Sequence, residues 1–145
     1  MIELVVEVQR RLQMQCGERF AFVGGVAALP ATGQMPPQFP AAYIVPLVHE
    51  PVSSSALSGA AQVQSFGFAV VQAVKHANDA SGAKAMELLV AGRQAVVDAL
   101  MGWTPIGAGA PITFTGGSLE RVETGVVWWT DEFLTARAIL VEPQS

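Results

Sequence analysis

Apolar side chains recur at steps of three and four residues over two stretches of the chain, the spacing of one face of an α-helix. The first stretch runs from Ile2 to Gln15 and ends just before Gly17, and glycine commonly follows the last turn of a helix. The second stretch runs from Ala83 to Met101 and ends at Gly102. We therefore predict two helices with these bounds, and we expect Trp103 to fold back onto the core.

Runs of β-branched and aromatic residues predict strands between and after the helices. A short strand is expected at Arg19 to Val23 and a buried strand at Ala41 to His49. Pro46 indicates that the second of these lies at a sheet edge or bulge, because proline has no N–H to donate. Ala61 to Val74 is a long strand with larger side chains on one side and small ones on the other. The small side suits close packing by a helix.

Two further strands are predicted at the end of the chain, from Ile112 to Val122 and from Gly125 to Leu140. They are expected to form a long hairpin that turns at Glu123 to Gly125, with a bulge at Gly116 and Gly117. The whole pattern predicts an α+β fold in a single domain covering residues 1–145. In it, an antiparallel or mixed sheet of four to five strands is packed by two helices, in the order helix, strand, strand, helix, strand, strand.

Two stretches rich in glycine, proline or serine predict loops. Gly24 to Pro40 is a long loop that contains no charged residue. A solvated loop is seldom so apolar, so we expect it to pack either on its own domain or on a neighbouring subunit. Glu50 to Ala60 reads as a flexible connection.

The composition of the chain indicates that it assembles with other proteins. The chain has 145 residues, of which 51% are hydrophobic and only 14% charged, so part of its surface is expected to be covered by protein. The sequence contains no run of 18 apolar residues, so no membrane span is predicted. Glu3 and Glu7 interrupt the apolar N-terminus, which a secretory signal would keep uninterrupted. We expect a soluble protein made in the cytoplasm. The net charge of −4 disfavours a protein that coats nucleic acid.

The residue types that carry catalysis or bind metals are few and scattered. His49 and His76 lack further ligands at metal-binding spacing, and the adjacent Glu50 would point to the opposite face of a strand. Cys16 is interpreted as a small apolar residue at a helix end. We therefore expect no catalytic residue, no metal and no cofactor, and hence no enzyme. The acidic pairs are expected at solvated strand positions: Glu120 with Glu123, and Asp131 with Glu132.

The adjacent tryptophans Trp128 and Trp129 are the most unusual local feature. In a strand, one indole faces the core and the other faces outward. The outward indole needs cover, either from a helix of the same subunit or from a neighbouring subunit, since tryptophan is enriched at protein interfaces.

The chain resembles the tail terminator proteins of long-tailed bacteriophages, including those of Mu-like phages. The resemblance lies in the order of the predicted elements and in the residue pattern of each, and it covers nearly the whole chain. It rests on the N-terminal helix MIELVVEVQRRLQ, on Pro40 to Leu47 after a Gly/Pro loop, on the strand Gln62 to Val74, on the helix Ala85 to Trp103, and on Val127 to Phe133. Other head–tail connector and tail-completion proteins share this pattern and remain an alternative. A small ligand-binding or hydrolytic domain is a second alternative.

The resemblance implies a structural virion protein without a cofactor. Members form a hexameric ring that caps the tail tube, ends its polymerisation and provides the surface for head attachment. The implied partners are further copies of the chain, the tail tube protein and a head-completion or connector protein; DNA would pass through the lumen without specific binding, and no membrane is involved. The implied location is the head-proximal end of the virion tail. The loops Gly24 to Pro40 and Ser53 to Gly59 are expected to contact neighbouring subunits or the tube, because they are long and poor in charge. The candidate interface residues are Met35, Gln38, Phe39, Ser54, Leu57, Trp128 and Trp129.

Overall fold

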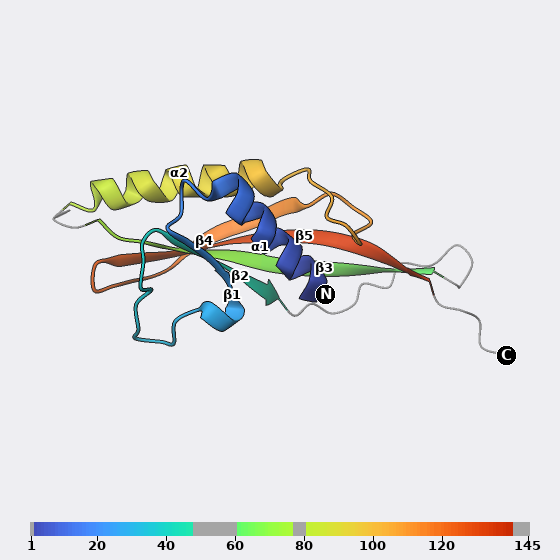
Figure 1. The fold of residues 1–145 in the computed structure, drawn as a ribbon, viewed down its shortest axis with the longest axis horizontal. Helices are drawn as coiled ribbons and strands as arrows, with labels where there is room; N and C mark the ends of the chain where they lie inside the picture. The colour runs from blue at the N-terminus through green and yellow to red at the C-terminus, as the bar shows by residue number, and fades with distance from the viewer. Residues whose placement is uncertain (1, 48–60, 77–80, 141–145) are drawn as a thin grey trace.

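The computed structural model describes residues 2–47, 61–76 and 81–140. Helices α1 (Ile2–Cys16) and α2 (Ala83–Leu100) pack on one face of a five-stranded sheet (Figure 1). Both helices lie where the three- and four-residue spacing predicts them. The predicted connection at Glu50 to Ala60, which contains Ser54 and Leu57, lies outside the described residues. Within the described part of the chain, no helix is long and apolar enough to span a membrane.

The sheet has the strand order β1-β2-β3-β5-β4 and is mixed. Strand β1 runs parallel to β2, and the other neighbours are antiparallel. The predicted α+β class is thereby confirmed. The strands are β1 (Phe22–Gly25), β2 (Ala41–Leu47), β3 (Ala61–Val74), β4 (Thr113–Glu123) and β5 (Val126–Leu140).

The first strand begins three residues later than predicted, at Phe22 rather than Arg19. Its position follows from pairing, because β1 lies beside Ala41–Ile44 of β2 and takes its register from that strand. Pro46 lies beyond the last of these pairs, where β2 has no described neighbour on its outer side. The edge position predicted from the missing proline N–H is therefore correct.

The closing hairpin turns where predicted, with each strand boundary at the turn moved by one residue. Only Thr124 and Gly125 separate β4 from β5, and both have positive φ angles, 52° and 77°. Two consecutive positive φ angles are typical of the two-residue turn whose twist matches that of the flanking strands. The predicted bulge is also present, since the register shifts between Phe114 and Gly116.

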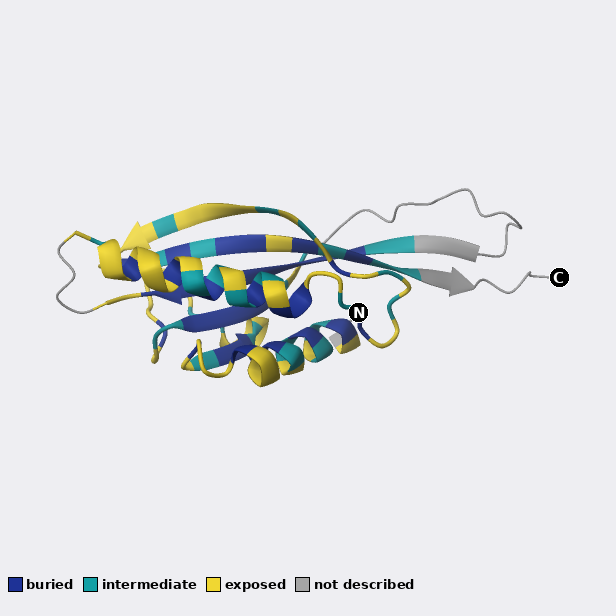
Figure 2. Ribbon diagram, turned by 90° about the horizontal axis from the view of Figure 1, so that it is seen from above, coloured by how far each residue is buried: buried dark blue, intermediate teal, exposed yellow. Residues whose placement is uncertain are grey.

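The core between helices and sheet is built on the larger side of β3. Phe66, Phe68 and Val70 pack with buried residues of both helices, such as Leu12 and Val96. The prediction that a helix packs on the small side of β3 is therefore wrong. The aromatic rings fill the wide space between two inclined helices and the sheet, which alanine side chains would leave empty. Figure 2 shows the buried stripe of α2 facing the strands.

The small side of β3 faces a different layer. Here the 3₁₀ helix η1 (Val26–Ala28) and the loop 29–40 cross the sheet on the side opposite α1 and α2 (Figure 1). Leu29 and Phe39 of this loop pack against a buried cluster that includes Tyr43 and Trp128. Of the two alternatives left open for the loop, packing on its own domain is thus realised by these two side chains.

The ends of the two longest strands extend beyond the rest of the sheet. Ala61–Phe66 of β3 pair with Thr135–Leu140 of β5, while β2 and β4 pair only with later residues of β3 and earlier residues of β5. A two-stranded ribbon therefore projects from the five-stranded body, as the extended ends of β3 and β5 show in Figure 1.

Candidate assembly surfaces

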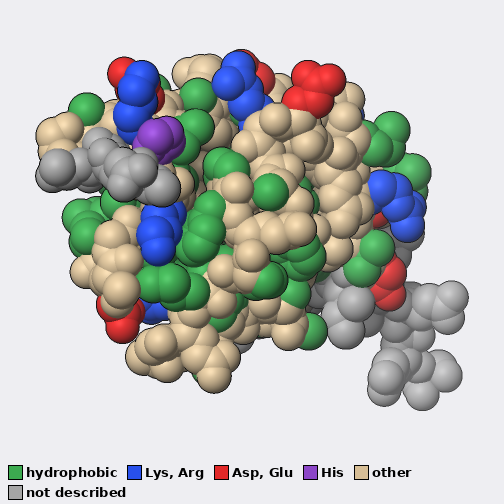
Figure 3. Space-filling model, turned by 60° about the vertical axis from the view of Figure 1, so that its left-hand side comes forward, with side chains coloured by type: hydrophobic (Ala, Val, Ile, Leu, Met, Phe, Trp, Pro, Cys, Tyr) green, Lys and Arg blue, Asp and Glu red, His purple; other side chains and the backbone are tan. Residues whose placement is uncertain are grey.

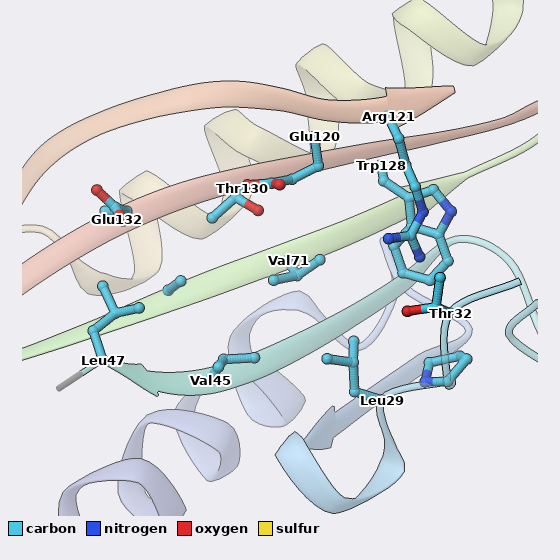
Figure 4. Close-up of a pocket in the computed structure, with 12 residues that line it drawn as sticks. Leu29, Thr32, Val45, Leu47, Val71, Glu120, Arg121, Trp128, Thr130 and Glu132 are labelled. Carbon is cyan, nitrogen blue, oxygen red and sulfur yellow. The ribbon is translucent and has the colours of Figure 1, made fainter. Parts of the chain in front are cut away.

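A hollow of about 350 Å³ opens on the face of the sheet opposite α1 and α2. Its floor is apolar and includes Val45 and Val71, while Leu29 of the loop 29–40 forms one wall (Figure 4). We call this hollow the sheet groove. It is lined by Leu29, Pro30, Thr32, Val45, Leu47, Ala69, Val71, Glu120, Arg121, Trp128, Thr130 and Glu132.

The rim of the sheet groove carries acidic side chains that have no basic partner within the described chain. Glu120 of β4 and Glu132 of β5 are both exposed, and neither forms an ion pair with another described residue. Arg121, the one basic residue of the lining, is already engaged. Its guanidinium lies 4.5 Å from the ring centre of Trp128, and its Nε is 3.2 Å from a carboxylate oxygen of Glu123. The groove therefore offers an apolar floor beside uncompensated negative charge.

The two tryptophans point to opposite faces of the sheet, as strand alternation requires. Trp128 lies on the face opposite α1 and α2 and is only 3% exposed, because Phe39 and Arg121 help to cover it. Trp129 lies under α2, where its N–H donates to Asp131 at 2.9 Å. Both indoles therefore find cover within one subunit, and their contribution to an interface stays a prediction.

Asp131 is fully buried and forms the most extensive polar contact of the described residues. Arg93 of α2 donates to both of its carboxylate oxygens, from Nη2 at 2.9 Å and from Nε at 3.1 Å. The same guanidinium stacks 4.2 Å from the ring centre of Trp129. The expected solvated position is thus wrong for Asp131, whereas Glu132 is exposed as predicted. The alternation along β5 contains the signal, since Asp131 falls on the same side as the buried Phe133.

A glycine lets β4 close over this buried cluster. A Cβ atom on Gly117 would overlap the Asp131 carboxylate and lie 2.9 Å from nitrogens of both Arg93 and Trp129. The bulge that begins at Gly116 and the ion pair beneath it therefore form one unit, which links α2, β4 and β5.

A second surface with a distinct character lies on the helix side of the molecule. Ile106, in the connection between α2 and β4, is 85% exposed, and Met14 of α1 is 76% exposed. Both line a shallow hollow together with Arg10, Arg11 and Trp103. Arg11 is engaged, because its Nε donates to the Ala99 carbonyl at 2.6 Å and its guanidinium stacks on Trp103.

Arg10 differs from Arg11 in having no such partner among the described residues. It is exposed beside Ile106 and Met14, and no described hydrogen bond or ion pair involves it. We call Arg10, Met14 and Ile106 the Ile106 knob. Sequence reasoning did not select these residues, since Ile106 stands in a Gly/Pro/Ala connection whose exposure no local pattern reveals. Trp103 does fold back on the core as predicted.

The loop 29–40 contains three candidate interface residues, of which two are exposed. Met35 is 39% exposed and Gln38 is exposed, whereas Phe39 is partly buried against the sheet. The loop tip and the β4–β5 turn lie side by side, because Met35 and Thr124 line the same small hollow. This end of the molecule thus combines two exposed connections. Ser54 and Leu57 lie outside the described residues.

Of the residues considered for chemistry, His76 is exposed and Cys16 is buried, while His49 lies outside the described residues. The thiol of Cys16 is buried at the end of α1 and lies 3.5 Å from the Ala95 carbonyl oxygen. Burial raises the pKa of this thiol. Within residues 2–47, 61–76 and 81–140, no group of three or more His, Cys, Asp or Glu side chains is placed to hold a metal ion.

Comparison with known families gives these surfaces their context. Residues 5–141 match the family model described as phage tail terminator protein. A search of curated proteins found no match. The family match extends from the first turn of α1 to the end of β5, and so covers both helices and every strand of the sheet. The chain therefore belongs to the phage tail terminator family.

Proposed function

We propose that the chain forms a closed ring, hexameric by resemblance, which caps the tail tube at its head-proximal end. The ring would stop further addition of tube protein by covering the last tube layer, and its other side would provide the surface for a head-completion or connector protein. The observation that carries this proposal is the family match over residues 5–141. Membership makes the chain a structural component of the phage tail that assembles with other tail or head proteins.

The surface chemistry of one subunit supports a role in assembly. Only 14% of the residues are charged, and in the view of Figure 3 the charged side chains lie mostly around the rim, with hydrophobic and uncharged groups between them. A monomeric protein ordinarily covers more of its surface with charge. Large hydrophobic side chains are also exposed on several elements. They are Val6, Met14, Val26, Met35, Met86, Leu88, Val90, Met101, Ile106, Leu119 and Val122.

The loop tip is the part of the subunit that we assign to the tube. Met35 and Gln38 project from a loop whose base is held to the sheet by Leu29 and Phe39, so the tip is presented on a firm support. An uncharged, partly apolar tip suits burial against another protein, because it loses little hydration when it is covered. Ser54 and Leu57 remain proposed contacts of the same kind.

The net charge of −4 fits a ring through which DNA passes. Acidic side chains that face a lumen repel phosphates, and so prevent the ring from holding the DNA during its passage. We therefore propose that the lumen has acidic or neutral walls and makes no specific contact with the bases.

Growth of tail tubes in vitro tests the proposal. Tube protein of the same phage is polymerised with and without the chain, and tube lengths are measured by electron microscopy. The wild-type chain should arrest growth at far fewer copies than the tube protein present. The double variant Met35→Glu, Gln38→Glu should stay folded, since both side chains are exposed, and should lose roughly tenfold or more in arrest because it buries two charges at the contact.

A matched variant separates this contact from a general effect of added charge. Met86→Glu with Gln94→Glu introduces the same two charges at exposed positions of α2, on the opposite side of the sheet. It should arrest tubes as the wild type does. Tubes of unchanged length in the presence of the wild-type chain would refute the capping function, whereas equal activity of both double variants would refute only the role of the loop tip.

A further inference from the structure

We infer that the sheet groove of one copy of the chain receives the Ile106 knob of the next copy. The inference rests on the proposed ring and specifies which two surfaces of neighbouring subunits meet in it. It follows from the chemistry of the two surfaces and from their positions on the molecule.

The sheet groove is suited to an apolar group flanked by positive charge. Its floor is formed by side chains such as Val45 and Val71, and its rim carries the carboxylates of Glu120 and Glu132. Neither carboxylate is neutralised by a described residue of its own chain. Arg121 does not neutralise them, because it is held by Glu123 and Trp128.

The Ile106 knob has the complementary composition. Among the described residues, Ile106 is the most exposed large hydrophobic side chain, and Met14 lines the same shallow hollow. Arg10 supplies a guanidinium that forms no ion pair with a described residue, and the hollow holds two arginines, Arg10 and Arg11, against one carboxylate, that of Glu7. Burial of an isoleucine side chain in an apolar hollow favours association, and unlike charges at the rim fix the orientation of the partners.

The dimensions of the sheet groove fit a single knob rather than a helix. The groove crosses β2, β3, β5 and β4, which span about 14 Å at the usual spacing of neighbouring strands. An α-helix with its side chains is 10–12 Å across and would need the groove to extend along its axis as well. One isoleucine with a neighbouring methionine fills such a space better.

The positions of the two surfaces dictate how copies would associate. The knob lies on the side of α1 and α2, and the groove lies on the opposite face of the sheet. Contacts between different patches of identical subunits run head to tail, and they close into a ring when the rotation per subunit divides a full turn. This is the contact class that a ring requires, whereas a twofold dimer would need one patch that complements itself.

Site-directed crosslinking tests the contact directly. Ile106→Cys is made in one preparation and Val45→Cys in another, and a short bismaleimide is added to each alone and to their mixture. The native Cys16 is buried and serves as the unreactive background. The mixture should give crosslinked heterodimers, and a chain with both substitutions should give a ladder of covalent oligomers. Val90→Cys, an exposed position on α2, replaces Ile106→Cys in the matched control and should give no product with Val45→Cys.

Charge reversal provides an independent readout. Arg10→Glu should weaken self-association by roughly tenfold, as should Glu120→Lys combined with Glu132→Lys, and the three changes together should recover most of the loss. Lys84→Glu, on the exposed start of α2, is the control and should have little effect. Sedimentation velocity measures the association, and circular dichroism confirms that each variant is folded.

The outcomes separate this contact from the ring itself. The experiments are done on free protein and on protein bound to tail tubes. Rings that form without any product between positions 106 and 45, and without recovery by the combined charge reversal, would overturn the knob-and-groove contact alone. A wild-type chain that forms no ring in either setting would overturn the contact and the proposed ring together.

Discussion

At the scale of single residues, Asp131 connects more of the molecule than any other described polar group. Its buried carboxylate accepts hydrogen bonds from Arg93 on α2 and from Trp129 on its own strand, and Gly117 of β4 closes over it. A buried carboxylate is costly unless it is paired and hydrogen-bonded. The cluster therefore links α2 to the hairpin, because this arrangement pairs the buried charge and satisfies its hydrogen bonds.

Asp131→Asn should destabilise the fold by about 2 kcal/mol. Breaking a fully buried ion pair costs roughly 3–5 kcal/mol, and the loss is smaller here because the Arg93 side chain is 32% exposed and regains some hydration. Urea unfolding at neutral pH measures the change. The neighbouring Glu132→Gln is the matched control and should change stability by less than about 0.5 kcal/mol, since Glu132 is exposed. Equal stability of the two variants would show that the pair does not hold the helix.

Individual residues were predictable from sequence where backbone chemistry alone decides their place. Pro46 could be assigned to an edge because it has no N–H, and the glycines of the bulge marked the break in the ladder. Asp131 could not be placed by the usual expectation that strand carboxylates are solvated. Its burial depends on Arg93, which lies 38 residues away and reaches it only through the packing of α2.

At the scale of elements, α2 lies unusually close to the strand beneath it. Gly92 faces the buried side chain of Gln72 on β3, and a Cβ atom at this position would lie 2.5 Å from the Gln72 amide oxygen and 3.3 Å from the ring of Phe20. Glycine in the middle of a helix costs about 1 kcal/mol relative to alanine. Here the close approach of helix and strand requires it.

Gly92→Leu should therefore separate α2 from β3 and destabilise the protein by about 3 kcal/mol, the upper range for overpacking of a filled core. Val90→Leu, two residues earlier on the exposed side of α2, adds volume without a clash and should be nearly neutral. Thermal unfolding of both variants compares them. A melting temperature for Gly92→Leu equal to that of the control would mean that the helix does not depend on this contact.

The positions of the helices and strands along the chain could be predicted from the spacing of apolar residues. Which face of each strand the helices cover could not. Both helices and the long strands lie within a few residues of the ranges that spacing and composition predict. The face of β3 on which the helices pack was predicted wrongly, because small side chains at positions such as Gly67 and Ala69 suggested close helix packing. In the fold the loop 29–40 and Trp128 cover that side of β3. A loop that packs on a sheet has no regular spacing of apolar residues, so its position cannot be predicted from the sequence pattern.

At the scale of the whole molecule, the subunit presents two unlike sides. The helix side carries the Ile106 knob, and the opposite side carries the sheet groove with its unpaired carboxylates. Neither surface was predictable from sequence, because each combines residues that are distant along the chain. The sheet groove joins the loop 29–40 to four strands, and the Ile106 knob joins α1 to the connection between α2 and β4. The low fraction of charged residues did predict that part of the surface is covered by other proteins. The family match indicates that these are phage tail or head proteins.

Cryo-electron microscopy of isolated tails at their head-proximal end tests the central claim most directly. The proposed function predicts a single ring of this chain that closes the last layer of tube protein, with neighbouring copies related by rotation about the tail axis and an open lumen. A map in which the chain is absent from that end, or is repeated along the length of the tube, would contradict it.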